Sequence, residues 1–174
     1  MRHRLSPILA AWLILLVGLL APRPVAAQPA DLVTVRPVVS QSALRVGDNA
    51  VWAVVVDIKP GYHAQSNTPS NENFIAFDLQ LEPNEKLILG RPIFPKGHDQ
   101  SYPALGELNL YDGRVVVYVP VRVKDGVGEG PVTLRGTLTY QICDDQTCFA
   151  PESPVVEQTT SIAPATAAMT LVEP

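Results

Sequence analysis

The chain of 174 residues contains two cysteines, Cys143 and Cys148, with four residues between them. In such a pair, one thiolate can attack a disulfide of another protein, and the second cysteine can then release that protein by closing a new disulfide. Four residues are a normal length for a β-hairpin loop, and cysteines facing each other there would have α-carbons about 5.5 Å apart. The spacing predicts a pair that can open and close without unfolding its surroundings.

The same pair could instead be a structural disulfide that holds the hairpin together. Closing so short a loop stabilises a protein by only about 2 kcal/mol in the chain-entropy model, and a domain of this size has a core of its own. These arguments leave the reactive and the structural interpretation almost equally supported. Asp144 and Asp145, between the cysteines, are expected to form the turn, although nearby carboxylates also disfavour a thiolate.

A zinc site would require two further ligands. His63 and His98 are the only histidines outside the N-terminal segment, and both are far from the cysteines in sequence. We therefore expect no bound metal, and the sequence indicates no cofactor.

Residues 1–27 have the three-part layout of a secretory signal peptide. Arg2 and Arg4 supply a positive start, residues 8–20 form an apolar run, and Val25-Ala26-Ala27 supplies the small residues of a cleavage site. The apolar run is shorter than the ~20 residues that a membrane-spanning helix needs. We expect cleavage after Ala27 and export from the cytoplasm to an oxidising compartment, where a close cysteine pair is expected to form a disulfide.

The exported part of the chain is acidic. The full sequence carries 13 Lys and Arg against 17 Asp and Glu, a formal net charge of −4, and the signal peptide contains arginines but no carboxylates. No cluster of basic residues is present, which argues against nucleic acid and anionic lipid as partners. We expect a monomer whose partners are other proteins.

The pattern of apolar residues predicts an all-β domain over residues 28–160. Residues 49–59 and 132–141 alternate with a period of two, as half-buried strands do. Further strands are predicted at 32–40, 43–46, 74–81, 86–94, 114–124 and 154–160. Seven or so strands and no 3.6-residue apolar period favour an immunoglobulin-like antiparallel β-sandwich, with a jelly roll or a small barrel as the alternative. Pro120 suggests an edge strand or a bulge.

Three segments lack this alternation. Residues 60–73 and 95–110 are predicted as long loops, which in a compact domain are usually functional or disordered. Residues 161–174, rich in Ala, Thr and Pro, are predicted as a flexible tail or linker.

The segment YQICDDQTCFAP, residues 140–151, resembles the Tyr-Gln-x-Cys…Cys-x-x-Pro signature of one family. This family is the N-terminal periplasmic domain of the thiol:disulfide interchange protein DsbD, also called the disulfide bond corrector family. Pro60-Gly61-Tyr62-His63, Phe94-Pro95-Lys96-Gly97 and Tyr111-Asp112-Gly113 are similar to other family segments. The resemblance covers about residues 44–156, and only the cysteine segment is specific.

The resemblance implies an immunoglobulin-like fold with the cysteine pair at one end. It also implies a relay of reducing equivalents, from a membrane thiol reductase or a thioredoxin-like domain to periplasmic thioredoxin-fold proteins, including those of cytochrome c biogenesis. Cys148 would then form the mixed disulfide with the partner, and Cys143 would resolve it.

The resemblance further implies a cap that shields the pair from unwanted oxidation. By position the resemblance places the cap at residues 99–110, with Tyr102 or Leu105 as the covering side chain, and Tyr62 and His63 would lie beside the pair. Moving the cap aside only for the right partner would protect the thiols kinetically.

The chain also departs from the family. Nothing in it resembles the family's transmembrane electron channel or its thioredoxin domain, and no Cys-x-x-Cys is present. The expectation is a component of a protein-disulfide reductase that needs a separate electron donor, or one piece of a longer protein. The alternative is a non-catalytic extracytoplasmic binding or chaperone-like β-sandwich with a structural disulfide.

Overall fold

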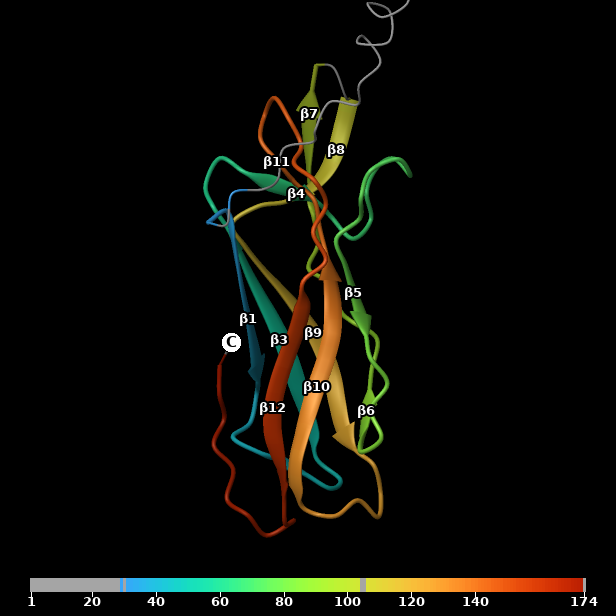
Figure 1. The fold of residues 1–174 in the computed structure, drawn as a ribbon, viewed down its shortest axis with the longest axis vertical. Helices are drawn as coiled ribbons and strands as arrows, with labels where there is room; N and C mark the ends of the chain where they lie inside the picture. The colour runs from blue at the N-terminus through green and yellow to red at the C-terminus, as the bar shows by residue number, and fades with distance from the viewer. Residues whose placement is uncertain (1–28, 30, 104–105, 174) are drawn as a thin grey trace, which may run out of the picture.

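The computed structural model describes residues 29, 31–103 and 106–173, so the predicted signal peptide lies outside the described residues. Within those residues the chain forms strands and no helix. The strands make three four-stranded sheets, two in an elongated body and one at an end of it (Figure 1). No helix in the described part of the chain is long and apolar enough to cross a membrane.

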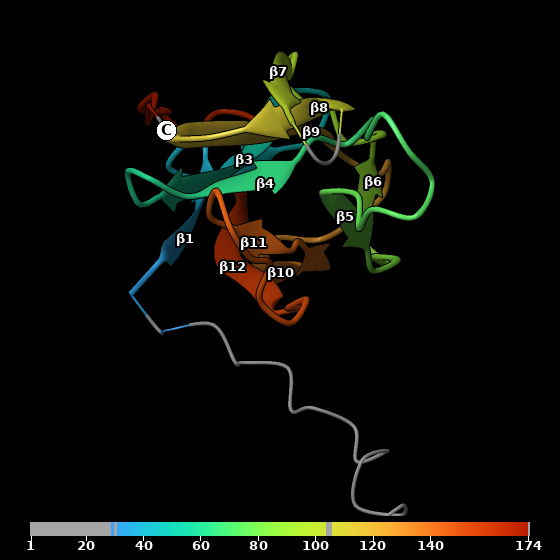
Figure 2. The same ribbon diagram turned by 90° about the horizontal axis from the view of Figure 1, so that it is seen from above.

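The first sheet has the strand order β1-β3-β9-β6, and the second has the order β2-β12-β10-β5. Seen from above, the two sheets lie face to face (Figure 2). All pairings within them are antiparallel except that of β12 with β2. The strands of the first sheet are β1 (Val33–Val39), β3 (Asn49–Ile58), β6 (Leu87–Leu89) and β9 (Arg114–Val123). Those of the second are β2 (Leu44–Arg45), β5 (Asp78–Leu81), β10 (Gly130–Thr139) and β12 (Val155–Ala163).

The core lies between these two sheets. Trp52 and Val54 on β3 are fully buried, as are Val117 on β9 and Leu134 on β10. β-Branched and aromatic residues suit a pleated surface that is buried on one face. This confirms the prediction of an all-β, immunoglobulin-like antiparallel β-sandwich, and β3, β9 and β10 begin and end within two residues of the predicted bounds.

Pro120 lies neither in an edge strand nor at a bulge, contrary to the prediction. It lies in β9, which is an inner strand between β3 and β6 and carries no bulge at this point. Its carbonyl accepts a hydrogen bond of 2.8 Å from the amide of Gly90, just after β6 ends. A Cβ at Gly90 would come within 3.0–3.1 Å of the proline ring, so glycine provides the space. The missing N–H of proline is tolerated because β6 has ended where it would be needed.

The third sheet corrects the prediction of two long loops. Its order is β11-β4-β8-β7, and three of these strands come from the segments expected to lack strands. They are β4 (His63–Gln65), β7 (His98–Tyr102) and β8 (Gly106–Tyr111), and the fourth is β11 (Ile142–Cys143). Strands of two or three residues, or with sequences such as His-Asp-Gln-Ser-Tyr, have too little apolar alternation to be recognised.

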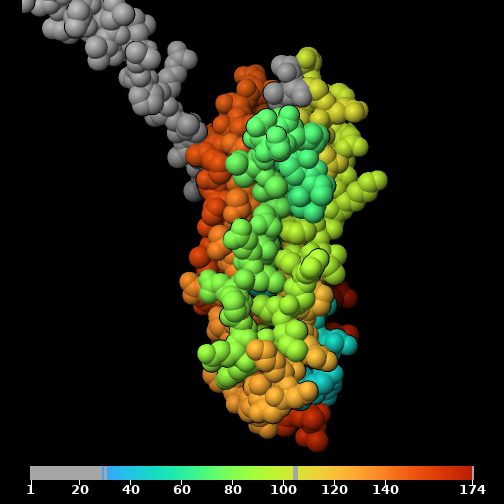
Figure 3. Space-filling view, turned by 90° about the vertical axis from the view of Figure 1, so that its right-hand side faces the viewer, coloured from blue at the N-terminus to red at the C-terminus, as the bar shows by residue number. Residues whose placement is uncertain are grey.

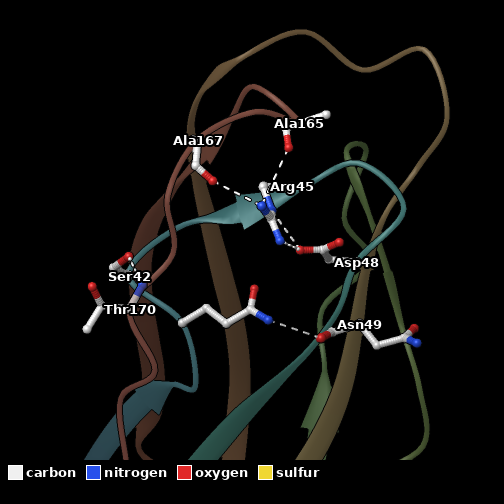
Figure 4. Close-up of polar contacts among 8 residues, drawn as sticks. Ser42, Arg45, Asp48, Asn49, Ala165, Ala167 and Thr170 are labelled. Carbon is white, nitrogen blue, oxygen red and sulfur yellow. Dashed lines mark hydrogen bonds and ion pairs between the residues drawn. The ribbon is translucent and has the colours of Figure 1, made fainter.

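The C-terminal tail folds back along the body, which differs from the expected flexible end. β12 continues to Ala163, and the amide of Val172 donates to the carbonyl of Ser40 over 2.9 Å. Arg45 donates to the carbonyl of Ala167 over 3.0 Å and to Asp48 over 2.7 Å (Figure 4). Backbone carbonyls and one arginine therefore hold a segment that has no strand periodicity.

Candidate functional site

The cysteine pair lies in a tight hairpin at the end of the molecule that carries the third sheet. Cys143 and Cys148 form a disulfide, and their α-carbons are 4.0 Å apart, closer than the spacing predicted. The amide of Phe149 donates to the carbonyl of Ile142, and that of Asp144 to the carbonyl of Thr147, each over 2.9 Å. The predicted hairpin pairing is confirmed, because these two hydrogen bonds flank the disulfide.

Asp144 shapes the turn between the cysteines. Its carboxylate accepts hydrogen bonds of 2.8 Å from the amides of Gln146 and Thr147. These backbone hydrogen bonds lower the pKa of Asp144, so the carboxylate remains charged while the turn is formed. Turn formation was the role expected of the two aspartates, and Asp144 has it, whereas Asp145 is exposed.

The two cysteines differ in exposure. Cys143 is 3% exposed, and it belongs to the edge strand β11, where it lies between His63 of β4 and Cys148 of the hairpin. Cys148 is on the outer side of the hairpin and is exposed. An attacking thiolate must reach a sulfur along the line of the disulfide bond, so access governs which sulfur it attacks. Cys148 is therefore the more exposed residue of the pair.

A pocket of about 330 Å³ adjoins the disulfide. Both cysteines line it, together with the turn between them and with side chains from β4, β7 and β8. In the space-filling view of one face, the hairpin in orange, the segment before β5 in green and the β7–β8 hairpin in yellow-green gather at this end (Figure 3). The residues from outside the cysteine hairpin that line it are His63, Gln65, Phe74, Tyr102, Pro103 and Leu108.

A second depression, of about 430 Å³, lies on the outer face of the first sheet. Its lining is almost entirely apolar, with Val38, Val51, Ile93 and Pro120 among its residues. Tyr118 is its one ionisable side chain. The pocket beside the disulfide is therefore the better candidate for chemistry.

His63 is next to the inner cysteine, as expected. The register pairs His63 with Cys143, and residues directly opposite each other project from the same face of a sheet. The His63 side chain is buried, at 8% exposure, and this burial lowers its pKa, although Asp145, Asp112 and Asp144 oppose the shift. The imidazole is accordingly neutral around neutral pH.

Tyr102 covers His63 from β7. Its hydroxyl is 3.4 Å from Nδ1 of His63, and the two ring centroids are 5.6 Å apart. Burial raises the pKa of Tyr102, so its hydroxyl stays protonated. The contact joins the β7–β8 hairpin to the pocket, at the position expected for the cap.

The other predicted residues lie differently. Tyr62 packs against Phe149, with ring centroids 6.3 Å apart, and so supports the hairpin rather than lining the pocket. Leu105 lies outside the described residues. The sequence analysis missed Gln65, which is 2% exposed, lines the pocket, and has no hydrogen-bond partner for Oε1 within the described chain. The period of two from His63 could have identified it.

The family model described as "Thiol:disulfide interchange protein DsbD, N-terminal" matches residues 30–160. The search of curated proteins gives no match.

Solved structures are similar to the chain at low sequence identity. One is a complex between the DsbD N-terminal and PilB N-terminal domains of Neisseria meningitidis. The match has 20% sequence identity and a TM-score of 0.50, and it covers 80% of this chain and 93% of that chain. Another is the reduced DsbD N-terminal domain of Neisseria meningitidis, with 21% identity and a TM-score of 0.48, over 84% of this chain and 94% of that chain. A third is the N-terminal periplasmic domain of ScsB from Proteus mirabilis, with 17% identity and a TM-score of 0.45, over 79% of this chain and 49% of that chain. The complex supports the sandwich fold, and the family match over three quarters of the sequence assigns the chain to the family of the N-terminal domain of the thiol:disulfide interchange protein DsbD.

Proposed function

We propose that this chain is a periplasmic thiol–disulfide exchange module that relays reducing equivalents through Cys143 and Cys148. It receives them from a membrane thiol reductase or a thioredoxin-like domain and delivers them to thioredoxin-fold proteins. In this proposal Cys148 forms the mixed disulfide with the partner, and Cys143 resolves it. Membership of the DsbD N-terminal family supports this function.

The observation that carries the proposal is the asymmetry of the cysteine pair. Cys148 is exposed, whereas Cys143, directly opposite it, is 3% exposed. The inner cysteine is thus poised to attack Cys148, while few other reagents can reach it. The bond closes a loop of four residues, and neither cysteine belongs to the cluster of buried residues that forms the core, so opening the bond should leave the core packing in place.

The β7–β8 hairpin is proposed as the cap. Tyr102 contacts His63 at the pocket, and the sequence of β7 is polar and exposed along most of its length. A hairpin of this kind is supported by few buried contacts, and such elements are the ones that open locally at low cost. A docking partner would displace the hairpin and open the pocket that both cysteines line.

The complex of the Neisseria DsbD N-terminal domain with PilB supplies a probe for the partner class. The reduced Cys143→Ser variant is mixed with the oxidised PilB N-terminal domain, and acid-quenched samples are separated without reductant. We expect a mixed disulfide, because Cys148 is exposed. The matched control, Cys148→Ser, should give at least tenfold less mixed disulfide, because its remaining thiol is buried. A tenfold difference in rate corresponds to about 1.4 kcal/mol in barrier height.

The reduction potential separates this function from a binding sandwich with a structural disulfide. A relay requires a potential above about −300 mV, within reach of cellular thiol donors. A lower potential, together with no trapped complex in the Cys143→Ser variant, would establish the structural role instead.

A further inference from the structure

Three side chains form a row across the third sheet. The strand register places His63 on β4 opposite Cys143 on β11, and Cys143 is opposite Cys148 in the hairpin. Directly opposite residues share one face of a sheet, with Cβ atoms about 4.5–5.5 Å apart. All three side chains line the same pocket. One imidazole is therefore adjacent to the inner cysteine, on the side away from the outer cysteine.

The thiol of Cys143 must lose its proton before it can attack a disulfide. Only a thiolate attacks a disulfide, and burial opposes the charged form of a thiol. Cys143 is 3% exposed, so little solvent is available to take its proton. The carboxylate of Asp144 directly follows Cys143 and further opposes a negative charge there. The resolving step thus needs a base that is already in the pocket.

We propose that His63 is the base that removes the proton of the Cys143 thiol in the resolving step, an inference that rests on the proposed relay function. The S–H bond of Cys143 breaks, and its proton moves to a ring nitrogen of His63. The Cys143 thiolate attacks Sγ of Cys148 in the mixed disulfide. The Cys143–Cys148 bond forms as the bond from Cys148 to the partner breaks.

The electrons and the proton balance in this step. The partner sulfur leaves as a thiolate with the bonding pair, so two electrons pass to the partner while the cysteine pair is oxidised. The imidazolium then gives its proton to that thiolate or to water. Proton removal by a positioned side chain contributes about 10²–10⁴-fold in other enzymes.

The surroundings of His63 suit both of its states. Burial favours the neutral imidazole before the step, as a base must be. The hydroxyl of Tyr102, 3.4 Å from Nδ1, limits rotation of the ring. Carboxylates around the pocket stabilise the imidazolium once it forms, whereas His98 opposes it. The titratable groups that face His63 from the neighbouring elements are Asp112, Asp144, Asp145, His98 and Tyr102.

The test separates the two thiols by rate. The reduced protein is mixed in a stopped-flow instrument with 5,5′-dithiobis(2-nitrobenzoate), which releases one coloured thiolate when Cys148 attacks and a second when Cys143 resolves. The second phase reports the proposed proton transfer. We expect His63→Gln to slow the second phase at pH 7 at least about tenfold without slowing the first phase.

The pH profile gives a readout that a structural role would not move. In the wild-type protein the second phase should rise with pH to a plateau as His63 loses its proton, below the usual pH range for histidine because burial lowers its pKa. In His63→Gln the plateau should disappear, and the rate should keep rising with pH as the thiolate forms directly. His98→Gln, which removes an exposed imidazole outside the row, is the matched control and should keep the plateau and the fast second phase.

A second variant guards against misfolding. Free imidazole added to His63→Ala should restore the second phase in proportion to its concentration, because the pocket is large enough to admit it. An unchanged second phase in His63→Gln, or equal slowing of both phases without rescue of the alanine variant, would overturn the role of His63. Absence of the first phase in the wild-type protein would instead overturn the relay itself.

Discussion

The sandwich body, made of the first two sheets, and the site sheet, made of β11, β4, β8 and β7, are built on different principles. The body buries hydrocarbon side chains, such as those of Val54 on β3 and Leu134 on β10, and both of these strands are ten residues long. The site sheet has strands of two to six residues. In the described part of the chain, the buried polar residues are His63, Gln65 and Ser66, and all three are on or next to β4.

This difference separates stability from reactivity. Burial of apolar area contributes most of the folding free energy, and the body supplies that area. Polar groups in the site sheet add little to stability, because burying them costs free energy that their hydrogen bonds only partly return. These polar groups instead surround the disulfide, where they can affect its reactivity. Changes in the body should therefore alter unfolding, whereas changes in the site sheet should alter rates.

The largest expected effect is in the body. Leu134→Ala empties a fully buried position between the sheets and should lower the free energy of unfolding by about 2–5 kcal/mol. Urea unfolding measures the loss. The rate of the first reaction with 5,5′-dithiobis(2-nitrobenzoate) should stay at the wild-type value under native conditions. A large drop in that rate would show that the two regions are not separable.

Reduction of the disulfide should have a smaller effect on stability. The bond closes a short loop, so the reduced protein should be less stable than the oxidised protein by about 2 kcal/mol. Urea unfolding with and without reductant measures the difference, and the Cys143→Ser/Cys148→Ser double variant controls for the reductant. Unfolding of the whole sandwich on reduction would contradict a reusable pair.

Removal of the cap side chain should change a rate by about tenfold, equivalent to about 1.4 kcal/mol in barrier height. In reduced Tyr102→Ala the contact with His63 is lost, and the thiols should react faster with hydrogen peroxide. The matched control, Tyr102→Phe, keeps the ring and removes the hydroxyl, so it should react nearly as slowly as wild type. Equal rates in all three proteins would place the cap elsewhere.

The smallest effect on stability is expected at the C-terminal tail, residues 161–174. Arg45→Ala removes hydrogen bonds to Ala167 and Asp48, and a partly exposed ion pair contributes at most about 1 kcal/mol (Figure 4). Amide hydrogen exchange should show lost protection at Thr170 and Val172, which bond to the region around Ser40. Exchange in β4 should not change; loss of protection there would show coupling between the tail and the site.

The sequence predicted the body well and the site sheet poorly. Alternation over ten residues identifies β3 and β10, because apolar residues at every second position, such as Trp52 and Val54 in β3, lie on the face that packs against the other sheet. β4, with the sequence His-Ala-Gln, is buried on both faces and is too short for any period to appear. Strands like β4 and β7 form because neighbouring strands offer hydrogen-bonding partners, and a linear pattern does not reveal those partners.

The sequence by itself determined the all-β class, the hairpin that joins Cys143 to Cys148, and the family that the cysteine segment resembles. These follow from local features: a period of two, a loop of four residues and a short motif. Only the tertiary structure decided which cysteine is buried and that Gln65 shares the pocket. It also showed how Tyr102 covers His63. Burial and neighbours across a sheet depend on segments far apart in the chain, and the register that brings them together is set by the packing of the whole domain.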